Sequence, residues 1–272
     1  MQLHAEGRLP HAICVSAAPG WGHLEFAQRL GAHLLDIDAE AGLSAQAHPD
    51  LRWLEPDGSV IKIEQVRGLI NFAVQTAQIA SCKVAVLAQA DALNENAANA
   101  LLKTLEEPPP GTFLVLATER WSQMLPTVRS RCQRLLIPGN WPMARHWLLE
   151  QGLNEATVNE AEAEMGQAPL SCLRRSADQP SLAEWLAGVP QRSLEQSVKA
   201  LEGVPLADWL GRWQRHLTRW IAERSGESHV EQRVFDFADL LMDSRRQLLS
   251  SNSVNEKLML ELLVHRWQRL AE

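Results

Sequence analysis

The sequence predicts an α/β protein in which a parallel sheet, covered by helices on both faces, is followed by a region of helices alone. In the first half of the chain, short continuous apolar runs alternate with segments of helical periodicity. In the second half the apolar runs stop, whereas the helical periodicity continues. The chain has 272 residues, of which 46% are hydrophobic and 22% charged, and this is enough for about two or three globular domains.

Three apolar runs in the first half predict buried parallel strands at residues 12–16, 83–87 and 112–117. Three segments with apolar residues at helical spacing predict helices at residues 24–34, 66–77 and 97–105. A turn at Pro19 and Gly20 precedes the first helix, Asn94 is placed to cap the third, and Pro108 follows its end.

The second half contains helical signals only. Residues 141–151 and 154–165 are expected to form short helices, and residues 177–190 are expected to form a linker rich in proline and glycine. Ser193 and Gln196 have the spacing of a capping box, which predicts the start of a further helix.

Apolar residues then recur at helical spacing over residues 206–221 and again over residues 260–270, and this repetition predicts a helical bundle. Several tryptophans, among them Trp209 and Trp213, fall on the same apolar stripe. We therefore interpret them as part of a core or of a subunit interface rather than as a platform on which bases stack.

Charge and cysteine content argue against several functions. Lysine and arginine total 26 against 33 aspartate and glutamate, and the net charge of −7 disfavours a chain that grips DNA phosphates by itself. The cysteines lack the CxxC spacing of zinc modules and are expected to be reduced, buried thiols: Cys14, Cys82, Cys132 and Cys172. No apolar stretch approaches about 20 residues and the start resembles no secretion signal, so we expect a cytoplasmic protein without a membrane contact.

The segment between the first strand and the first helix lies where NTPases place the phosphate-binding loop GxxxxGK[ST]. Four residues keep a glycine-rich turn there: Pro19, Gly20, Trp21 and Gly22. The changed positions are Ala17 for the first glycine, His23 for the lysine and Leu24 for the hydroxyl residue. Leucine cannot hold a magnesium ion, and histidine is shorter than lysine and mostly neutral at pH 7. Considered alone, such a turn is only a connector between a strand and a helix.

The acidic residues that a hydrolysing NTPase of this type needs are missing after the strand at residues 83–87. The chain has Ala88 and Gln89 where one carboxylate would hold magnesium and another would polarise the attacking water. Asp91 lies further on, and we interpret it as a carboxylate at the start of a helix or on the surface. The chain is therefore not expected to hydrolyse nucleotide by itself. The alternative is an autonomous ATPase in which His23 and Asp91 replace the lysine and the magnesium carboxylate.

Residues 99–109 form the run NALLKTLEEPP, which is followed by FLVLAT at residues 113–118 and by Arg-Ser-Arg-Cys at residues 129–132. These motifs, together with His-Pro-Asp-Leu at residues 48–51, resemble those of the clamp-loader subunits of bacterial DNA polymerase III. The resemblance is strong over about residues 9–138 and weak beyond them. The emptied nucleotide loop is similar to that of the subunit type that does not hydrolyse ATP, rather than to that of the gamma/tau motor subunits.

The resemblance implies a RecA-like AAA+ α/β domain at residues 1–138, a small helical lid domain at residues 139–190 and an all-α collar domain at residues 191–272. It also implies that the chain acts in DNA replication within a complex that contains gamma/tau and delta subunits. That complex loads the sliding clamp on primed DNA.

In clamp loaders, the serine and arginine of the SRC motif end a short helix at a subunit border. The resemblance therefore implies that Arg131, with Ser130 beside it, is an arginine finger that reaches the ATP bound by the neighbouring gamma/tau subunit. Arg129 and Arg134 are weaker candidates for this role. Ser130 and Cys132 are expected to shape the turn rather than to react.

The chain departs from the family pattern in three places. Residues 35–47 contain no cysteine, so the four-cysteine zinc module of many members is absent and no zinc is expected. The lead before the first strand, residues 1–9, is shorter than usual, and Pro169 stands where nucleotide-sensing relatives place an arginine in the lid. No cofactor is expected, and the turn at Gly20 and Gly22 leaves open a weak binding of nucleotide without hydrolysis.

Overall fold

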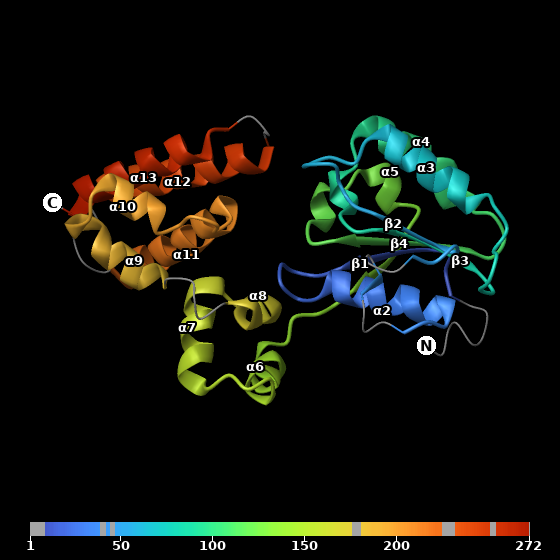
Figure 1. Ribbon diagram of the computed structural model, residues 1–272, viewed down its shortest axis with the longest axis horizontal. Helices are drawn as coiled ribbons and strands as arrows, with labels where there is room; N and C mark the ends of the chain where they lie inside the picture. The colour runs from blue at the N-terminus through green and yellow to red at the C-terminus, as the bar shows by residue number, and fades with distance from the viewer. Residues whose placement is uncertain are drawn as a thin grey trace. The chain divides into compact units, whose positions relative to one another are not determined.

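The computed structural model (Figure 1) describes residues 9–38, 42–43, 47–175, 181–224, 232–250 and 254–271. The short lead at residues 1–8 therefore lies outside the described part. The chain divides into two compact units, residues 1–140 and residues 141–272. No helix among the described residues is both long enough and apolar enough to cross a bilayer.

The first unit contains a five-stranded parallel sheet with the strand order β2-β3-β4-β1-β5. Its strands are β1 (Ala12–Ser16), β2 (Leu51–Leu54), β3 (Lys83–Leu87), β4 (Thr112–Thr118) and β5 (Gln133–Leu136). The three central strands were predicted from their apolar runs, and every residue of β1 and β3 is buried. The sequence prediction omitted β2 and β5, because each lies at an edge of the sheet and mixes apolar with exposed polar residues.

Helices cover both faces of the sheet, as the α/β prediction requires (Figure 1). The helices of this unit are α2 (His23–Leu35), α3 (Ile63–Ala73), α4 (Glu95–Glu106) and the short α5 (Pro126–Arg129). Alternate residues of a strand point to opposite faces, so Cys14 packs in the core with α3 and α4, whereas Ile13 and Val15 pack in the core with α2. As predicted, the Asn94 side chain caps α4 by accepting the N–H of Ala97 at 2.8 Å.

The second predicted helix is shorter than expected, because α3 ends at Ala73 rather than continuing to residue 77. The Asp50 carboxylate accepts three backbone N–H groups from the segment that follows, at 2.7 Å from Gln78, 2.8 Å from Ile79 and 2.9 Å from Ala80. These N–H groups are consequently directed at a side chain rather than at helical carbonyls. The Lys83 ammonium lies 3.8 Å from Asp50 and 3.9 Å from the centre of the Phe72 ring.

The described residues of the second unit form helices and no strand. These are α6 (Trp141–Glu150), α7 (Glu155–Met165), α8 (Pro169–Arg174), α9 (Leu182–Gly188), α10 (Leu194–Lys199), α11 (Leu206–Arg224), α12 (Gln232–Ser250) and α13 (Glu256–Ala271), with a 3-10 turn η4 (Val189–Gln191). The predicted capping box of Ser193 and Gln196 is present at α10.

One sequence expectation for this unit was wrong, and one long helix was missed. The expected linker at residues 177–190 contains helix α9, whose Leu182, Trp185 and Leu186 are buried, while residues 177–180 lie outside the described part. Ser181 caps α9 by accepting the N–H of Glu184 at 3.1 Å. The prediction also omitted α12, because much of its apolar surface is exposed and its charged residues mask the helical pattern.

Four tryptophans of the helical bundle lie in its hydrophobic core. Trp185, Trp209 and Trp213 are at most 1% exposed, and Trp185 packs edge-on against both others with ring centres 5.6 and 5.2 Å apart. Trp267 of α13 lies 5.7 Å from Trp213 in the same arrangement. Buried indoles cannot stack on bases, so the interpretation of this stripe as core is confirmed for these residues.

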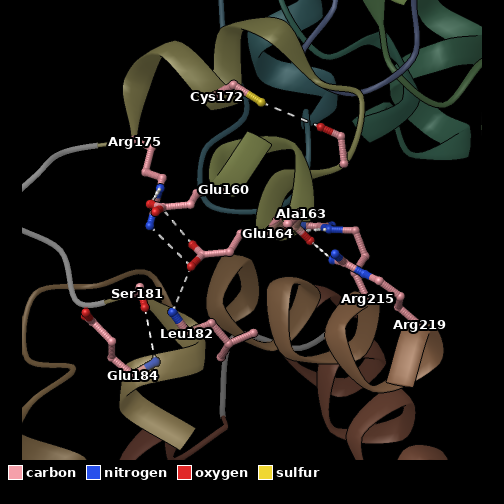
Figure 2. Close-up of polar contacts among 11 residues, drawn as sticks. Glu160, Ala163, Glu164, Cys172, Arg175, Ser181, Leu182, Glu184, Arg215 and Arg219 are labelled. Carbon is pink, nitrogen blue, oxygen red and sulfur yellow. Dashed lines mark hydrogen bonds and ion pairs between the residues drawn. The ribbon is translucent and has the colours of Figure 1, made fainter. Parts of the chain in front are cut away.

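The second unit has two hydrophobic clusters, one among α6, α7 and α8 and the other among α9 to α13. Glu164, near the end of α7, connects them (Figure 2). Its carboxylate accepts the N–H of Leu182 at 3.0 Å and pairs with Arg175, while Arg215 of α11 donates to its backbone carbonyl at 2.9 Å. Arg219 donates to the neighbouring carbonyl of Ala163. The division at residue 190 into a lid and a collar stays a prediction.

Candidate functional site

The turn between β1 and α2 has the geometry of a strand-to-helix loop that needs glycine. Gly20 has a φ of 75° and Gly22, which directly precedes α2, has a φ of 82°. Side-chain-bearing residues rarely adopt this left-handed conformation. No side chain caps the start of α2, and a helix start of this kind favours negative charge.

An acidic side chain of the same chain lies against this turn. The N–H of Gly20 donates to Oε1 of Glu119 at 3.2 Å, and Nδ1 of His23 lies 3.6 Å from the same oxygen. Burial lowers the pKa of His23 below its ordinary 6.5, although the Glu119 carboxylate acts in the opposite direction. At neutral pH, His23 therefore does not supply the permanent positive charge of the lysine that it replaces.

Asp91 is also engaged within the chain. It lies in a 3-10 turn, η2 (Ala90–Ala92), after the end of β3, and its side chain is 4% exposed. The hydroxyl of Thr118 donates to it at 2.5 Å, and Nε of Arg120 lies 2.8 Å from its second oxygen. Of the two positions expected for Asp91, the helix start is the one observed, since Asp91 lies in the first turn of η2 and Thr118 and Arg120 cover its carboxylate.

Two adjacent residues, Glu119 and Arg120, thus engage the two parts of the candidate nucleotide site, the glycine turn and Asp91. Glu119 pairs with the turn that would cradle a phosphate, and Arg120 pairs with the carboxylate that would have to hold a metal. No group of three or more potential metal ligands is found within the part of the chain that the structure describes. Sequence reasoning missed both partners, because neither belongs to the loop motif or to the strand that it examined.

Arg131 lies just beyond α5 and is 31% exposed at its side chain. Nε donates to Oε1 of Glu106 at 2.6 Å, and Nη2 pairs with the same oxygen. Nη1 donates to the carbonyl of Thr127 at 3.0 Å and to the hydroxyl of Ser130 at 3.3 Å. Ser130, whose hydroxyl also donates to the Thr127 carbonyl, therefore helps to fix the guanidinium at the end of the short helix.

The other residues of this motif are engaged elsewhere. Nε of Arg134 donates to Ser16 at 2.9 Å, and its guanidinium lies 4.7 Å from the centre of a Trp121 ring. Arg129 lies 5.9 Å from the same ring. Burial raises the pKa of the Cys132 thiol to about 12, which disfavours the reactive thiolate. All four cysteines are free, and the three others are buried.

The turn lies at the carboxyl end of the parallel strands, whereas Arg131 lies at their amino end. In the parallel pairing of β1 and β5, Ile13 is paired with Gln133 and Ser16 with Leu136. The turn follows the end of β1, whereas Arg131 precedes the start of β5. Glu106 lies at the same end of the strands as Arg131, because the carbonyl of the preceding Leu105 lies 2.9 Å from Nε2 of His11, and His11 directly precedes β1. The structure therefore does not bring Arg131 together with the Pro19–Gly22 turn.

The first unit has the RecA-like parallel-sheet fold of AAA+ proteins, and a helical region follows it in the chain. A solved gamma subunit-related protein of DNA polymerase III from Thermotoga maritima has the same fold, with a TM-score of 0.57 at 19% identity over 99% of both chains. The sequence model of the family described as "DNA polymerase III, delta subunit" matches residues 1–140.

The relatives with similar sequences give the particular family. The chain is 30% identical to DNA polymerase III subunit delta' of Pseudomonas aeruginosa, over 99% of this chain and 95% of the relative. It is 33% identical to the Escherichia coli subunit delta', over 75% of this chain and 63% of the relative. The chain belongs to the delta' subunit family of the DNA polymerase III clamp loader, and the resemblance carried by residues 99–109 and 129–132 is confirmed.

Proposed function

We propose that the chain is the clamp-loader subunit that hydrolyses no ATP itself and donates Arg131 to the ATP site of an adjacent gamma/tau subunit. It acts with gamma/tau and delta subunits in the cytoplasm, and the complex loads the sliding clamp on primed DNA. The observation that carries the proposal is that Arg131 lies at the amino end of the strands, whereas the chain's own loop lies at their carboxyl end.

The distance between Arg131 and the chain's own loop supports an action of Arg131 on another subunit. A strand rises about 3.3 Å per residue, so the five residues of β1 span roughly 16 Å. An arginine that far from its own loop acts on a phosphate only if another molecule brings that phosphate to it. Charge that develops on a transferred phosphoryl group is then neutralised from outside, which in GTPases contributes about 10³ to 10⁵ in rate.

The contacts of the loop support the absence of hydrolysis. Any phosphate would have to displace Glu119 from Gly20, and any metal would have to displace Arg120 from Asp91. Burial lowers the pKa of His23 below 6.5, so His23 does not supply the permanent positive charge of a lysine. The alternative, an autonomous ATPase that uses His23 and Asp91, would need both of these internal pairs to open.

The two hydrophobic clusters of the second unit support the proposed division of the helical region. Helices α6 to α8 would form the lid, within residues 139–190, and the bundle around Trp213 would form the collar, residues 191–272, that holds the ring together. Helix α9 packs with the bundle, so the boundary between these parts would fall before residue 182 rather than at residue 190.

The decisive experiment is reconstitution with gamma/tau and delta subunits, followed by measurement of the ATPase rate stimulated by clamp and primed DNA. Arg131→Ala is expected to lower that rate at least tenfold without loss of assembly. Arg29→Ala, which removes an exposed arginine of α2, is the matched control. An unchanged rate with Arg131→Ala would refute the role in trans, and magnesium-dependent ATP turnover by the isolated chain would favour the autonomous ATPase.

A further inference from the structure

Glu106 is the main partner of the Arg131 guanidinium. It is the last residue of α4 and lies in the NALLKTLEEPP run, 25 residues before Arg131 in the sequence. Its carboxylate is 49% exposed and meets Nε and Nη2 of Arg131 at one oxygen. The end of α4 thus places the Glu106 carboxylate against the guanidinium of Arg131, which follows α5.

The pairing leaves no guanidinium nitrogen of Arg131 unengaged. Nε and Nη2 are directed at Glu106, and Nη1 is directed at Thr127 and Ser130. An arginine binds phosphate best through two parallel N–H groups. While Glu106 holds Nε and Nη2, Arg131 cannot present the two parallel N–H groups of that side to a phosphate.

We propose that Glu106 is a positioning residue that holds Arg131 in a resting pair and releases it when the triphosphate of the neighbouring subunit arrives. This inference rests on the proposed role of Arg131 in trans. In the resting pair the carboxylate neutralises the guanidinium, so the triphosphate, with its larger negative charge, has to replace Glu106. Thr127 and Ser130 continue to hold Nη1 of the guanidinium during this exchange.

The resting pair makes a specific kinetic prediction. Removal of the charge by Glu106→Gln leaves Arg131 without its competitor before ATP binds, so the apparent KM for ATP of the reconstituted complex is expected to fall. The expected fall is about two- to fivefold, the range that an exposed ion pair accounts for. The kcat is expected to stay within about twofold, because in both proteins the guanidinium has left the carboxylate once the triphosphate is bound.

The test compares four variants in the reconstituted complex. Glu107→Gln removes a neighbouring exposed carboxylate and is the matched control. Arg131→Ala and the double variant with Glu106→Gln complete a double-mutant cycle, in which Glu106→Gln must lose its effect once Arg131 is gone. In the isolated chain, the ¹⁵N–¹H signal of Arg131 Nε should be protected from exchange with solvent and lose that protection in Glu106→Gln.

The outcomes separate the two proposals. If Arg131→Ala lowers the ATPase rate but Glu106→Gln leaves KM unchanged, the resting pair is refuted and the role in trans stands. A fall in kcat with Glu106→Gln also refutes it, because Glu106 would then orient Arg131 for the reaction rather than withhold it. If Arg131→Ala leaves the rate unchanged, the proposed function itself fails.

Discussion

Asp50→Asn should strongly destabilise the first unit, because Asp50 is a fully buried carboxylate with four partners. It is 0% exposed, accepts three backbone N–H groups at 2.7–2.9 Å, and lies 3.8 Å from the Lys83 ammonium, which is itself 2% exposed. Removal of one partner of a buried pair costs about 3–5 kcal/mol, since the other charge stays buried and uncompensated. For a unit of this size that corresponds to a fall in Tm of about 10–20 °C.

Urea and thermal unfolding followed by circular dichroism measure this loss, and Asp57→Asn supplies the control. Asp57 is 70% exposed and pairs with Lys62 at 2.7 Å, so its replacement should leave the free energy of unfolding almost unchanged. An equal loss in the free energy of unfolding for the two variants would refute the conclusion that burial and pairing make Asp50 important for stability.

The contribution of Asp50 also depends on pH. Burial by itself would raise the pKa of Asp50, but the N–H donors of Ile79, Ala80 and Gln78, together with Lys83, bring it below its ordinary 3.8. A carboxyl whose pKa is lower in the folded state stabilises the protein fully above its unfolded pKa and loses that effect as the pH falls through the folded value. The difference in the free energy of unfolding between the wild type and Asp50→Asn should therefore become smaller as the pH falls below about 3.8.

Further predictions concern the loop and the second unit. Gly20→Ala should cost about 1–2 kcal/mol in urea unfolding, because its φ of 75° is unfavourable for alanine, and a neutral effect would contradict the left-handed turn. An NMR titration should give His23 a pKa below 6.5, and Glu119→Gln should lower that pKa further; a rise would contradict the contact between them. Glu164→Ala should cost about 2–3 kcal/mol, because the N–H of Leu182 loses its charged acceptor, and a loss below 0.5 kcal/mol on the same urea scale would argue against this connection.

The parts of the fold that the sequence predicted are those with one dominant physical signal. β1 and β3 are buried on both faces and therefore consist of continuous apolar runs. The edge strands β2 and β5 have exposed residues such as Arg52 and Gln133, which break any such run. Helix α9 was hidden by its position near Pro190, since proline and glycine indicated a linker there.

The same distinction applies to the candidate site, where residues in local motifs were predicted and their distant partners were not. The residues of the turn and of the SRC motif could be predicted because each set is contiguous in the sequence and forms a local pattern. Glu106, Glu119 and Arg120 were missed as partners, because Glu106 meets Arg131 across 25 residues and Glu119 meets Gly20 across 99. Pairings of this kind arise from the folded arrangement of the sheet and leave no periodic signal in the chain.

The indole core of the second unit gives the protein a built-in optical probe. The chain has ten tryptophans and no tyrosine, so its intrinsic fluorescence comes from indoles alone. Excitation energy passes readily between rings as close as those of Trp185, Trp209 and Trp213, and edge-on pairs held in one orientation give a coupled near-ultraviolet dichroic band. Melting of this bundle can therefore be followed without a label through the loss of that dichroic band.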